Sequence, residues 1–217
     1  MVSSNAGHCL YGHIASSAQA RQLIDRFFQD DMFCGWGIRT LSAQSRRYNP
    51  MSYHNGSVWP HDNAMITAGF ARYGANDQAE RILSALFGAS ACVIDRRLPE
   101  LFCGFPRQAH QGPVPYPVAC KPQAWAAGSL FQFLQAILRL RIDAWAHRMT
   151  LGRVVLPVWL NEISIRGLQV HDARVDLRIV RGRGAQPLRC WRSMGTWRLS
   201  CMSEVEIPPV RKRYFPS

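Results

Sequence analysis

The chain has 217 residues, which is enough to bury a core and fits one large domain or one domain with an appendage. Hydrophobic residues make up 47% and aromatic residues 11% of the sequence, which excludes an intrinsically disordered protein. The net charge of +12 suggests nucleic acid as a partner. The basic residues are scattered, however, and no basic helix face emerges, so a nucleic-acid-binding protein is disfavoured.

The cysteines and the hydropathy pattern narrow the class of protein further. Seven cysteines are an odd number, and no C-x-x-C pair occurs, which argues against a disulfide framework and against a zinc knuckle. We therefore expect free thiols in a reducing cytoplasm. No secretory signal is visible at the N-terminus, and no apolar run approaches the roughly 18 residues of a membrane span, so no membrane is expected as a partner.

Four segments have the apolar periodicity of helices. Gly74 lies where a glycine would end the second helix, Asp77 and Glu80 have the spacing of a capping box for the third, and Pro122 suits the first turn of the fourth. The predicted helices, which we expect to pack as pairs in a larger helical array, span about 17–29, 62–73, 77–87 and 121–138.

Two loops of about 30 residues, 31–61 and 91–120, separate these helices and are far longer than ordinary connections. Loops of this length are usually functional or disordered, and their many rings favour a functional role. The rings are Phe33, Trp36, Tyr48, Tyr53 and Trp59 in the first loop and Phe102, Phe105 and Tyr116 in the second.

After Leu151 the pattern changes to short alternating runs, "VVLPVWL", "ISIRGLQV" and "ARVDLRIV", which predict strands with a glycine turn between the last two. Beyond Arg181 clear periodicity is lost, and we expect poor order. The predicted organisation is a helical domain over 1–150, a small β appendage over 151–181 and a basic tail over 182–217.

The first loop has the composition of a carbohydrate site. Sugars present C–H faces that pack on aromatic planes and hydroxyls that need fixed donors and acceptors. The alternative is that Tyr53 and Trp59 are core rings and that Asp62 merely caps the following helix. The candidate platforms are Trp36, Tyr53 and Trp59, and the candidate hydrogen-bonding residues are Arg39, His54, Asn55, His61, Asp62 and Asn63.

Glu100 is the one acidic residue in the apolar stretch "LPELFCGF". We expect partial desolvation to raise the pKa of this carboxyl, which would suit acid or base chemistry. The alternative is an ordinary loop glutamate that points at solvent. Glycoside hydrolysis needs two carboxyl groups, so Glu100 supplies at most one of them.

Four blocks of sequence, in order and sensibly spaced, resemble the C-terminal part of bacterial amylo-α-1,6-glucosidase or glycogen-debranching-like proteins. That group is related to the (α/α)6-barrel glycosidases of the mannosylglycerate hydrolase, trehalase and glucoamylase type. The resemblance covers roughly residues 4–178, and its blocks are "DMFCGWGIRTLS" (31–42), "YNPMSYHNGSVWPHDNAMI" (48–66), "RLPELFCGF" (97–105) and "YPVACKPQAWAAGS" (116–129).

The resemblance implies a mainly α fold, a partial (α/α)6 toroid with a small C-terminal β appendage, and an inverting glycosidase that needs neither a metal nor a cofactor. It implies that Glu100 is the general base that activates water and that an oligosaccharide or polysaccharide with α-glucosidic bonds is the substrate. The motif positions that would shape the sugar pocket are Trp36, Arg39, His54, Asn55, Trp59, His61, Asp62 and Trp125.

The sequence also departs from this family. The general acid of such enzymes is usually an Asp upstream of the matching blocks, and a six-pair barrel needs about twelve helices. The chain is therefore expected to be the C-terminal half of a barrel, with one apolar flank uncovered and a second chain or an upstream segment needed to complete it.

Three rival functions remain open. The first is a non-catalytic carbohydrate-binding or structural remnant that keeps the rings without an acid–base pair. The second is a nucleic-acid binder that acts through residues 182–217. The third, a metal at the histidines, is disfavoured because His54 and His61 are seven residues apart with no cysteine at ligand spacing.

Overall fold

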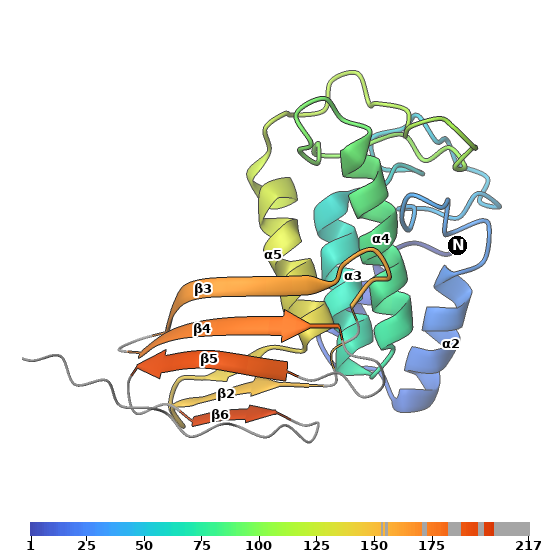
Figure 1. Cartoon of the computed structure of the whole chain (residues 1–217). Helices are drawn as coiled ribbons and strands as arrows, with labels where there is room; N and C mark the ends of the chain where they lie inside the picture. Colours follow the sequence, from blue (N-terminus) through green and yellow to red (C-terminus); the bar gives the residue numbers. More distant parts are fainter. Residues whose placement is uncertain (153, 155, 171–172, 182–187, 195–197, 202–217) are drawn as a thin grey trace, which may run out of the picture. The chain divides into compact units, whose positions relative to one another are not determined.

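The computed structural model describes residues 1–152, 154, 156–170, 173–181, 188–194 and 198–201. Contacts within the chain divide it into two compact units, Met1–Ile137 and Leu138–Ser217. The first unit is helical and the second is built from strands (Figure 1). The chain is thus mainly helical with small sheets, as predicted, whereas a partial toroid remains a prediction.

The helical unit contains five helices, and the four predicted from periodicity are confirmed to within a few residues. The additional helix has only six residues, which is too short for an apolar period to be visible in the sequence. The helices are α1 (Ala6–Tyr11), α2 (Ser17–Phe27), α3 (Pro60–Arg72), α4 (Asn76–Ala91) and α5 (Ala124–Leu138).

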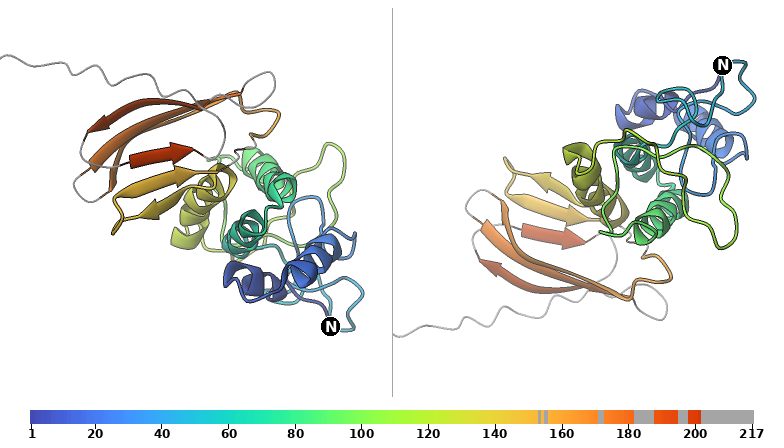
Figure 2. Two further views of the ribbon diagram at one scale, coloured as in Figure 1. Left: turned by 90° about the horizontal axis from the view of Figure 1, so that it is seen from below. Right: turned by 90° about the horizontal axis from the view of Figure 1, so that it is seen from above.

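Helix α3 lies between α1 and α4 (Figure 2). Glycines allow α1 to approach α3 closely, because a Cβ on Gly69 would lie 2.8 Å from Leu10 Cβ and 2.8 Å from the backbone nitrogen of Tyr11. A Cβ on Gly7 would lie 2.7 Å from Cγ1 of Ile66 on α3. Small residues on both helices therefore determine how α1 packs.

The helix ends follow the predicted signals in part. Gly74 has a φ of +79°, directly after the C-cap residue of α3, as expected for a C′ glycine. The predicted capping box at Asp77 is wrong, because α4 begins at Asn76 and places Asp77 inside its first turn. A capping box forms instead at α2, between Ser16 and Gln19.

The two long loops meet at one end of the helical unit. Only residues 73–75 connect α3 to α4, so these helices run antiparallel and the start of α3 lies beside the end of α4. The loop that leads into α3 and the loop that leads from α4 to α5 therefore emerge together (Figure 1). This arrangement brings residues around 53–61 close to residues around 98–120.

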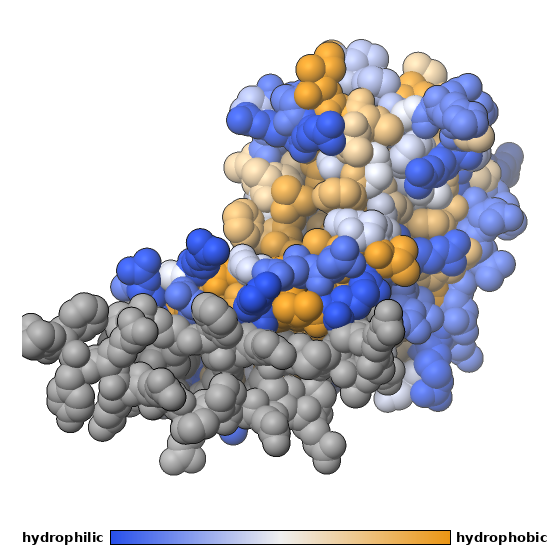
Figure 3. Space-filling view, viewed as in Figure 1, coloured by the Kyte–Doolittle hydropathy of each residue, from blue (hydrophilic) through white to orange (hydrophobic). Residues whose placement is uncertain are grey.

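Apolar side chains are exposed on α5, where Trp125, Leu130 and Phe131 are 65%, 40% and 76% accessible. Figure 3 shows that apolar residues gather over α4 and α5, while polar residues cover α2. Within the described part of the chain, no helix combines the length and the apolarity that crossing a bilayer requires.

Among the described residues of the second unit, the strands form two three-stranded sheets. In the first, β2 pairs with β1 in antiparallel and with β6 in parallel fashion; in the second, β4 pairs with β3 and β5, both antiparallel. Val175, Leu177 and Ile179 form the buried face of β4. The strands are β1 (Arg141–Asp143), β2 (Arg148–Leu151), β3 (Glu162–Val170), β4 (Ala173–Val180), β5 (Leu188–Met194) and β6 (Arg198–Cys201).

The strand predictions hold for β3 and β4 and differ elsewhere. The described residues of the run 154–160 form no strand, and Gly167 lies in a bulge inside β3 at a φ of +65° instead of in a turn. The hairpin of β1 and β2 pairs with β6 and lies in the second unit, which begins at Leu138, while the predicted organisation into 1–150, 151–181 and 182–217 stays a prediction.

The segment 182–217 was expected to be poorly ordered, and two strands, β5 and β6, are found in it. Each strand pairs with a neighbour that precedes residue 182, which local periodicity in the tail could not reveal. The other residues of this predicted tail, 182–187, 195–197 and 202–217, lie outside the described residues.

The close contact between α1 and α3 leads to a first prediction. Gly69→Ala is expected to lower the free energy of unfolding by about 1–3 kcal/mol, because the added methyl group collides with the backbone of α1 and outweighs the better helix propensity of alanine. Gly128→Ala on α5 is the control, since nothing lies within 4 Å of the added Cβ, and a gain of about 0.5–1 kcal/mol is expected. Urea titration measures both; equal effects would contradict the packing argument.

Candidate functional site

Backbone pairing joins the two long loops. The amide of Val58 donates to the carbonyl oxygen of Phe102 at 2.9 Å, and the amide of Phe102 donates back to Val58 at 3.0 Å. Gly104 lies so close to the first loop that a Cβ would collide with the carbonyl oxygen of Gly56. Trp59 and Glu100, which flank this pairing in the sequence, are therefore held near each other.

Asn63 fixes the start of α3 to the first loop. Its Oδ1 accepts from the amide of Ile38 at 2.7 Å, and its Nδ2 donates to the carbonyl oxygens of Ile38 and Trp59, both at 3.0 Å. The side chain is fully buried, and these bonds occupy its amide. These bonds hold the backbone of the loop, and a role of Asn63 in sugar binding stays a prediction.

Arg39 and Trp36 also lie in the interior of the loops. Arg39 is 2% exposed and donates through Nε to the carbonyl oxygen of Gly104 at 2.7 Å and through Nη1 to that of Asp30 at 2.8 Å. Trp36 is 3% exposed, and the guanidinium of Arg107 lies 4.2 Å from its ring centroid. Both side chains interact with other residues inside the loops, Arg39 through hydrogen bonds and Trp36 through its contact with Arg107, and neither contacts the rings around Trp59.

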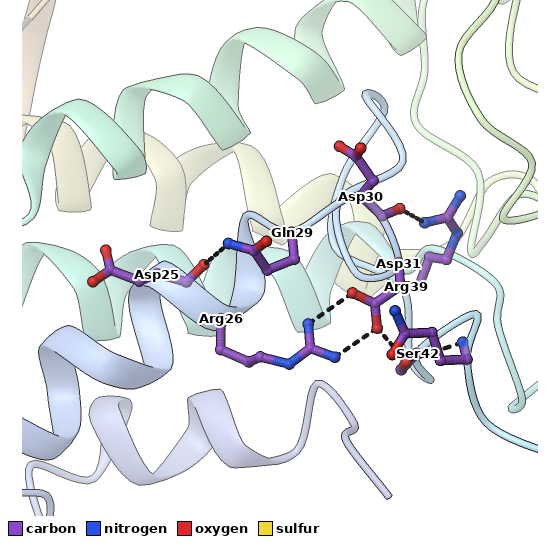
Figure 4. Close-up of polar contacts among 8 residues, drawn as sticks. Asp25, Arg26, Gln29, Asp30, Asp31, Arg39 and Ser42 are labelled. Atoms are coloured by element: carbon purple, nitrogen blue, oxygen red, sulfur yellow. Dashed lines mark hydrogen bonds and ion pairs between the residues drawn. The ribbon is translucent and has the colours of Figure 1, made fainter.

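A neighbouring polar cluster holds the same loop to α2 (Figure 4). Arg26 donates to both carboxylate oxygens of Asp31, at 2.8 and 2.6 Å, and the hydroxyl of Ser42 also donates to Asp31. The hydrogen bond from Arg26 lowers the pKa of Asp31, so this carboxylate is ionised and structural.

Glu100 is buried at the junction of the two loops, with 9% of its surface exposed. Its Oε1 accepts from the hydroxyl of Tyr53 at 2.7 Å, and its Oε2 accepts from the amide of Cys120 at 3.1 Å. These donors lower the pKa of Glu100, the Tyr53 hydroxyl most strongly, and they outweigh desolvation. The expectation of a raised pKa is therefore wrong.

Six rings form a connected group beside Glu100, which we call the ring cluster. Tyr53 lies edge-on to Trp59 with centroids 4.7 Å apart, and Trp59 lies edge-on to His61 at 5.4 Å. His61 in turn contacts Trp125 at the start of α5, at 4.6 Å. The ring cluster consists of Tyr53, His54, Trp59, His61, Tyr116 and Trp125.

The members of the ring cluster differ in how much surface they present. Trp59 is 8% exposed, and its indole N–H donates to Ser57 Oγ and to the carbonyl oxygen of Tyr53. Trp125 is 65% exposed, and His54, which stacks parallel to Trp59 at 5.8 Å, is exposed too. Asn55 beside it is also exposed. Trp125, His54 and Asn55 are therefore the most accessible groups, whereas Tyr53, His61 and Tyr116 are half-buried.

Asp62 pairs with a residue from the N-terminal helix. Its Oδ1 lies 2.6 Å from Nε2 of His8 on α1, and this hydrogen bond raises the pKa of His8. Asp62 does not cap α3, because the N-cap residue is Trp59 and no side chain bonds there. Asp62 Oδ2 and Nδ1 of the adjacent His61 are both buried without a hydrogen-bond partner, and burial lowers the pKa of His61.

Three residues at the site were not predicted from the sequence: His8, Tyr116 and Cys120. His8 is 54 residues from Asp62, and Cys120 is 20 residues from Glu100 and contributes its backbone amide. Tyr116 was noted only as a ring in the second loop, although it contacts Tyr53 at 5.6 Å. These partners become visible only in the fold: His8 reaches Asp62 through the packing of α1 on α3, and Cys120 reaches Glu100 within the second loop.

Metal ligation has no support in the part of the chain that the structure describes, where no three His, Cys, Asp or Glu side chains gather in a group suited to an ion. Five cysteines in this part, Cys9, Cys34, Cys92, Cys103 and Cys120, are free thiols.

The pair of His8 and Asp62 predicts a pH-dependent stability. Since the folded state raises the pKa of His8, the pair's contribution is fully present below pH 6.5, the ordinary value, and is lost as pH rises through the higher folded value. His8→Gln is expected to cost about 1 kcal/mol at the low end of this window, a small value because the imidazole is 39% exposed.

Urea titration across the neutral range measures this cost. In an Asp62→Asn background the same His8 replacement should have a cost that does not vary with pH, because the carboxylate is absent. A pH-dependent cost of equal size in both backgrounds would show that another group perturbs His8.

Comparison with known families finds a match for one part of the chain. Residues 3–92 match the family model of the mannosylglycerate hydrolase MGH1-like glycoside hydrolase domain. No curated protein matches the sequence significantly. The matched span includes His8 and the first four members of the ring cluster and ends before Glu100. Over these residues the chain is similar to a segment of a glycoside hydrolase domain.

Proposed function

We propose that the ring cluster and Glu100 form part of the saccharide site of a glycoside hydrolase that acts on α-glucosidic bonds, of the α-1,6 type found in glycogen-like oligosaccharides. The observation that carries the proposal is a carboxylate, held ionised by two hydrogen bonds, at the edge of a group of aromatic rings. The family match over residues 3–92, which ends before Glu100, independently supports the glycoside hydrolase class of this proposal.

Glu100 is proposed as the general base. A carboxylate offers about four lone-pair sites, and one hydrogen bond to each oxygen leaves sites that can accept a proton from water. In the proposed step a water oxygen attacks the anomeric carbon while its proton passes to Glu100, and the glycosidic oxygen leaves with a proton from a second carboxyl group. A lowered pKa suits this role, because a base must be ionised before the reaction.

The exposed rings are proposed to bind the sugar. Trp125 and His54 present faces on which C–H groups of a pyranose pack, and the amide of Asn55 offers a donor and an acceptor for hydroxyls. His61, whose lowered pKa favours the neutral form, adds no charge beside Trp125. An uncharged oligosaccharide fits these groups.

A second candidate is a carbohydrate-binding module without catalysis. It is favoured by the state of Asp62, the other carboxylate next to the ring cluster, which is buried and engaged by His8. Hydrolysis requires a second carboxyl group that can donate a proton. If the protein is a hydrolase, we propose that a second chain or an upstream segment supplies this second carboxyl group.

Glu100→Gln separates the two candidates. If Glu100 is the base, the replacement lowers kcat on α-glucosyl fluoride, whose fluoride leaves without a proton from a second carboxyl group, by about 10²–10⁴-fold. The Kd for an α-1,6-linked glucose trisaccharide should stay within about threefold, because the amide keeps the shape of the side chain. Hydrolysis is followed by glucose release, and binding by tryptophan fluorescence.

Glu80→Gln on α4 is the matched control, since this glutamate bonds to Ser84 on its own helix and should leave both quantities unchanged. Binding without turnover in the unaltered chain would favour the non-catalytic module. Absence of both would contradict the proposed function.

A further inference from the structure

We infer that Tyr53 is a positioning residue for the Glu100 carboxylate, and not a platform on which the sugar stacks. The inference rests on the proposed role of Glu100 as the base, and it assigns to one tyrosine the task of orienting that base. It changes the sequence-based expectation, in which Tyr53 was one of three sugar platforms.

The ring of Tyr53 is surrounded by other rings. Trp59 meets it at 82° with centroids 4.7 Å apart, and His54 meets it at 79° and 4.6 Å. Tyr116 from the second loop lies 5.6 Å away at 59°. Contacts from three neighbours restrict the orientation of this half-buried ring, and a stacked pyranose would have to compete with them.

The backbone of Tyr53 is fixed as well. Its carbonyl oxygen accepts from the hydroxyl of Ser57 at 2.7 Å and from the indole N–H of Trp59 at 3.1 Å. Trp59 therefore contacts both the ring and the main chain of Tyr53. With its backbone and ring held in this way, Tyr53 places its phenolic hydroxyl 2.7 Å from Oε1 of Glu100, to which it donates.

Glu100 is held from the opposite side by the second loop. The amide of Cys120 donates to Oε2 at 3.1 Å, and the amide of Glu100 donates to the carbonyl oxygen of Cys120 at 3.2 Å. The two carboxylate oxygens thus have donors from different loops, and the side chain of Cys120 adds a further, weaker hydrogen bond to Glu100. We call this arrangement, formed by Tyr53, Glu100 and Cys120, the carboxylate clasp.

The charges agree with the geometry. The hydrogen bond between Tyr53 and Glu100 lowers the pKa of Glu100 and raises the pKa of Tyr53 to about 12. Both shifts have the same meaning: the shared proton remains on the phenol, and the carboxylate remains ionised over the whole neutral range. Tyr53 therefore donates to Glu100 without competing with it for the proton of a water molecule.

A residue that orients the base and does not touch the sugar should affect kcat more than KM. Removing the hydroxyl while keeping the ring, as in Tyr53→Phe, is expected to move the acidic limb of the kcat profile upward by about one pH unit. KM should change little, since the ring contacts with Trp59 and His54 are retained.

The decisive experiment does not require turnover. The chain has five glutamates, so carboxyl carbons in protein labelled with ¹³C-glutamate can be titrated by NMR, and Glu100→Gln identifies the signal of Glu100. In the unaltered chain this signal should titrate below the ordinary value, and Tyr53→Phe should move its midpoint up by about one pH unit. Tyr116→Phe, which removes a hydroxyl from the neighbouring ring, should leave the midpoint unchanged.

A second measurement covers the case in which Tyr53→Phe does not fold. Tyrosinate absorbance after a rapid jump to alkaline pH should show one more ionised tyrosine in Glu100→Gln than in the unaltered chain, because the carboxylate no longer suppresses ionisation of Tyr53. An unchanged Glu100 midpoint in folded Tyr53→Phe, or an unchanged tyrosinate count, would overturn the inference. Loss of sugar binding with both titrations as expected would contradict the proposed function alone.

Discussion

The pairing of Val58 with Phe102 is the contact on which the site depends. Two reciprocal backbone hydrogen bonds join loops that are more than 40 residues apart, and they bring the segment ending in Trp59 beside the segment that contains Glu100. The side chains on both sides of this pairing then have fixed neighbours. Asn63 and Arg39 extend the same constraint, because each one satisfies backbone groups of a loop that has little regular structure.

Two opposing physical effects act on the pKa of Glu100. Burial raises the pKa of a carboxyl group, and hydrogen bonds to its ionised form lower it. A phenol and a backbone amide, one on each oxygen, prevail over burial at this position. An apolar sequence context therefore predicted the burial of Glu100 correctly and its protonation behaviour incorrectly, because the donors are 47 and 20 residues away.

The same distinction separates what the sequence could predict from what it could not. Apolar periodicity located four helices and the strands β3 and β4, since that signal is local. Trp36, Arg39 and Asn63 have the chemistry of sugar-binding residues, yet the same chemistry suits a buried loop that needs donors and acceptors for its own backbone. Residue type cannot distinguish these uses. Tyr53 and Glu100 were both singled out, but the bond between them follows only from the pairing of the loops.

The carboxylate clasp has a consequence for how the loops move. Tyr53 belongs to the loop before α3 and Cys120 to the loop before α5, and Glu100 bonds to both. The two loops therefore form one cooperative unit, in which local unfolding of either releases the same side chain. When either loop opens, the carboxylate of Glu100 therefore loses its fixed orientation at the same time.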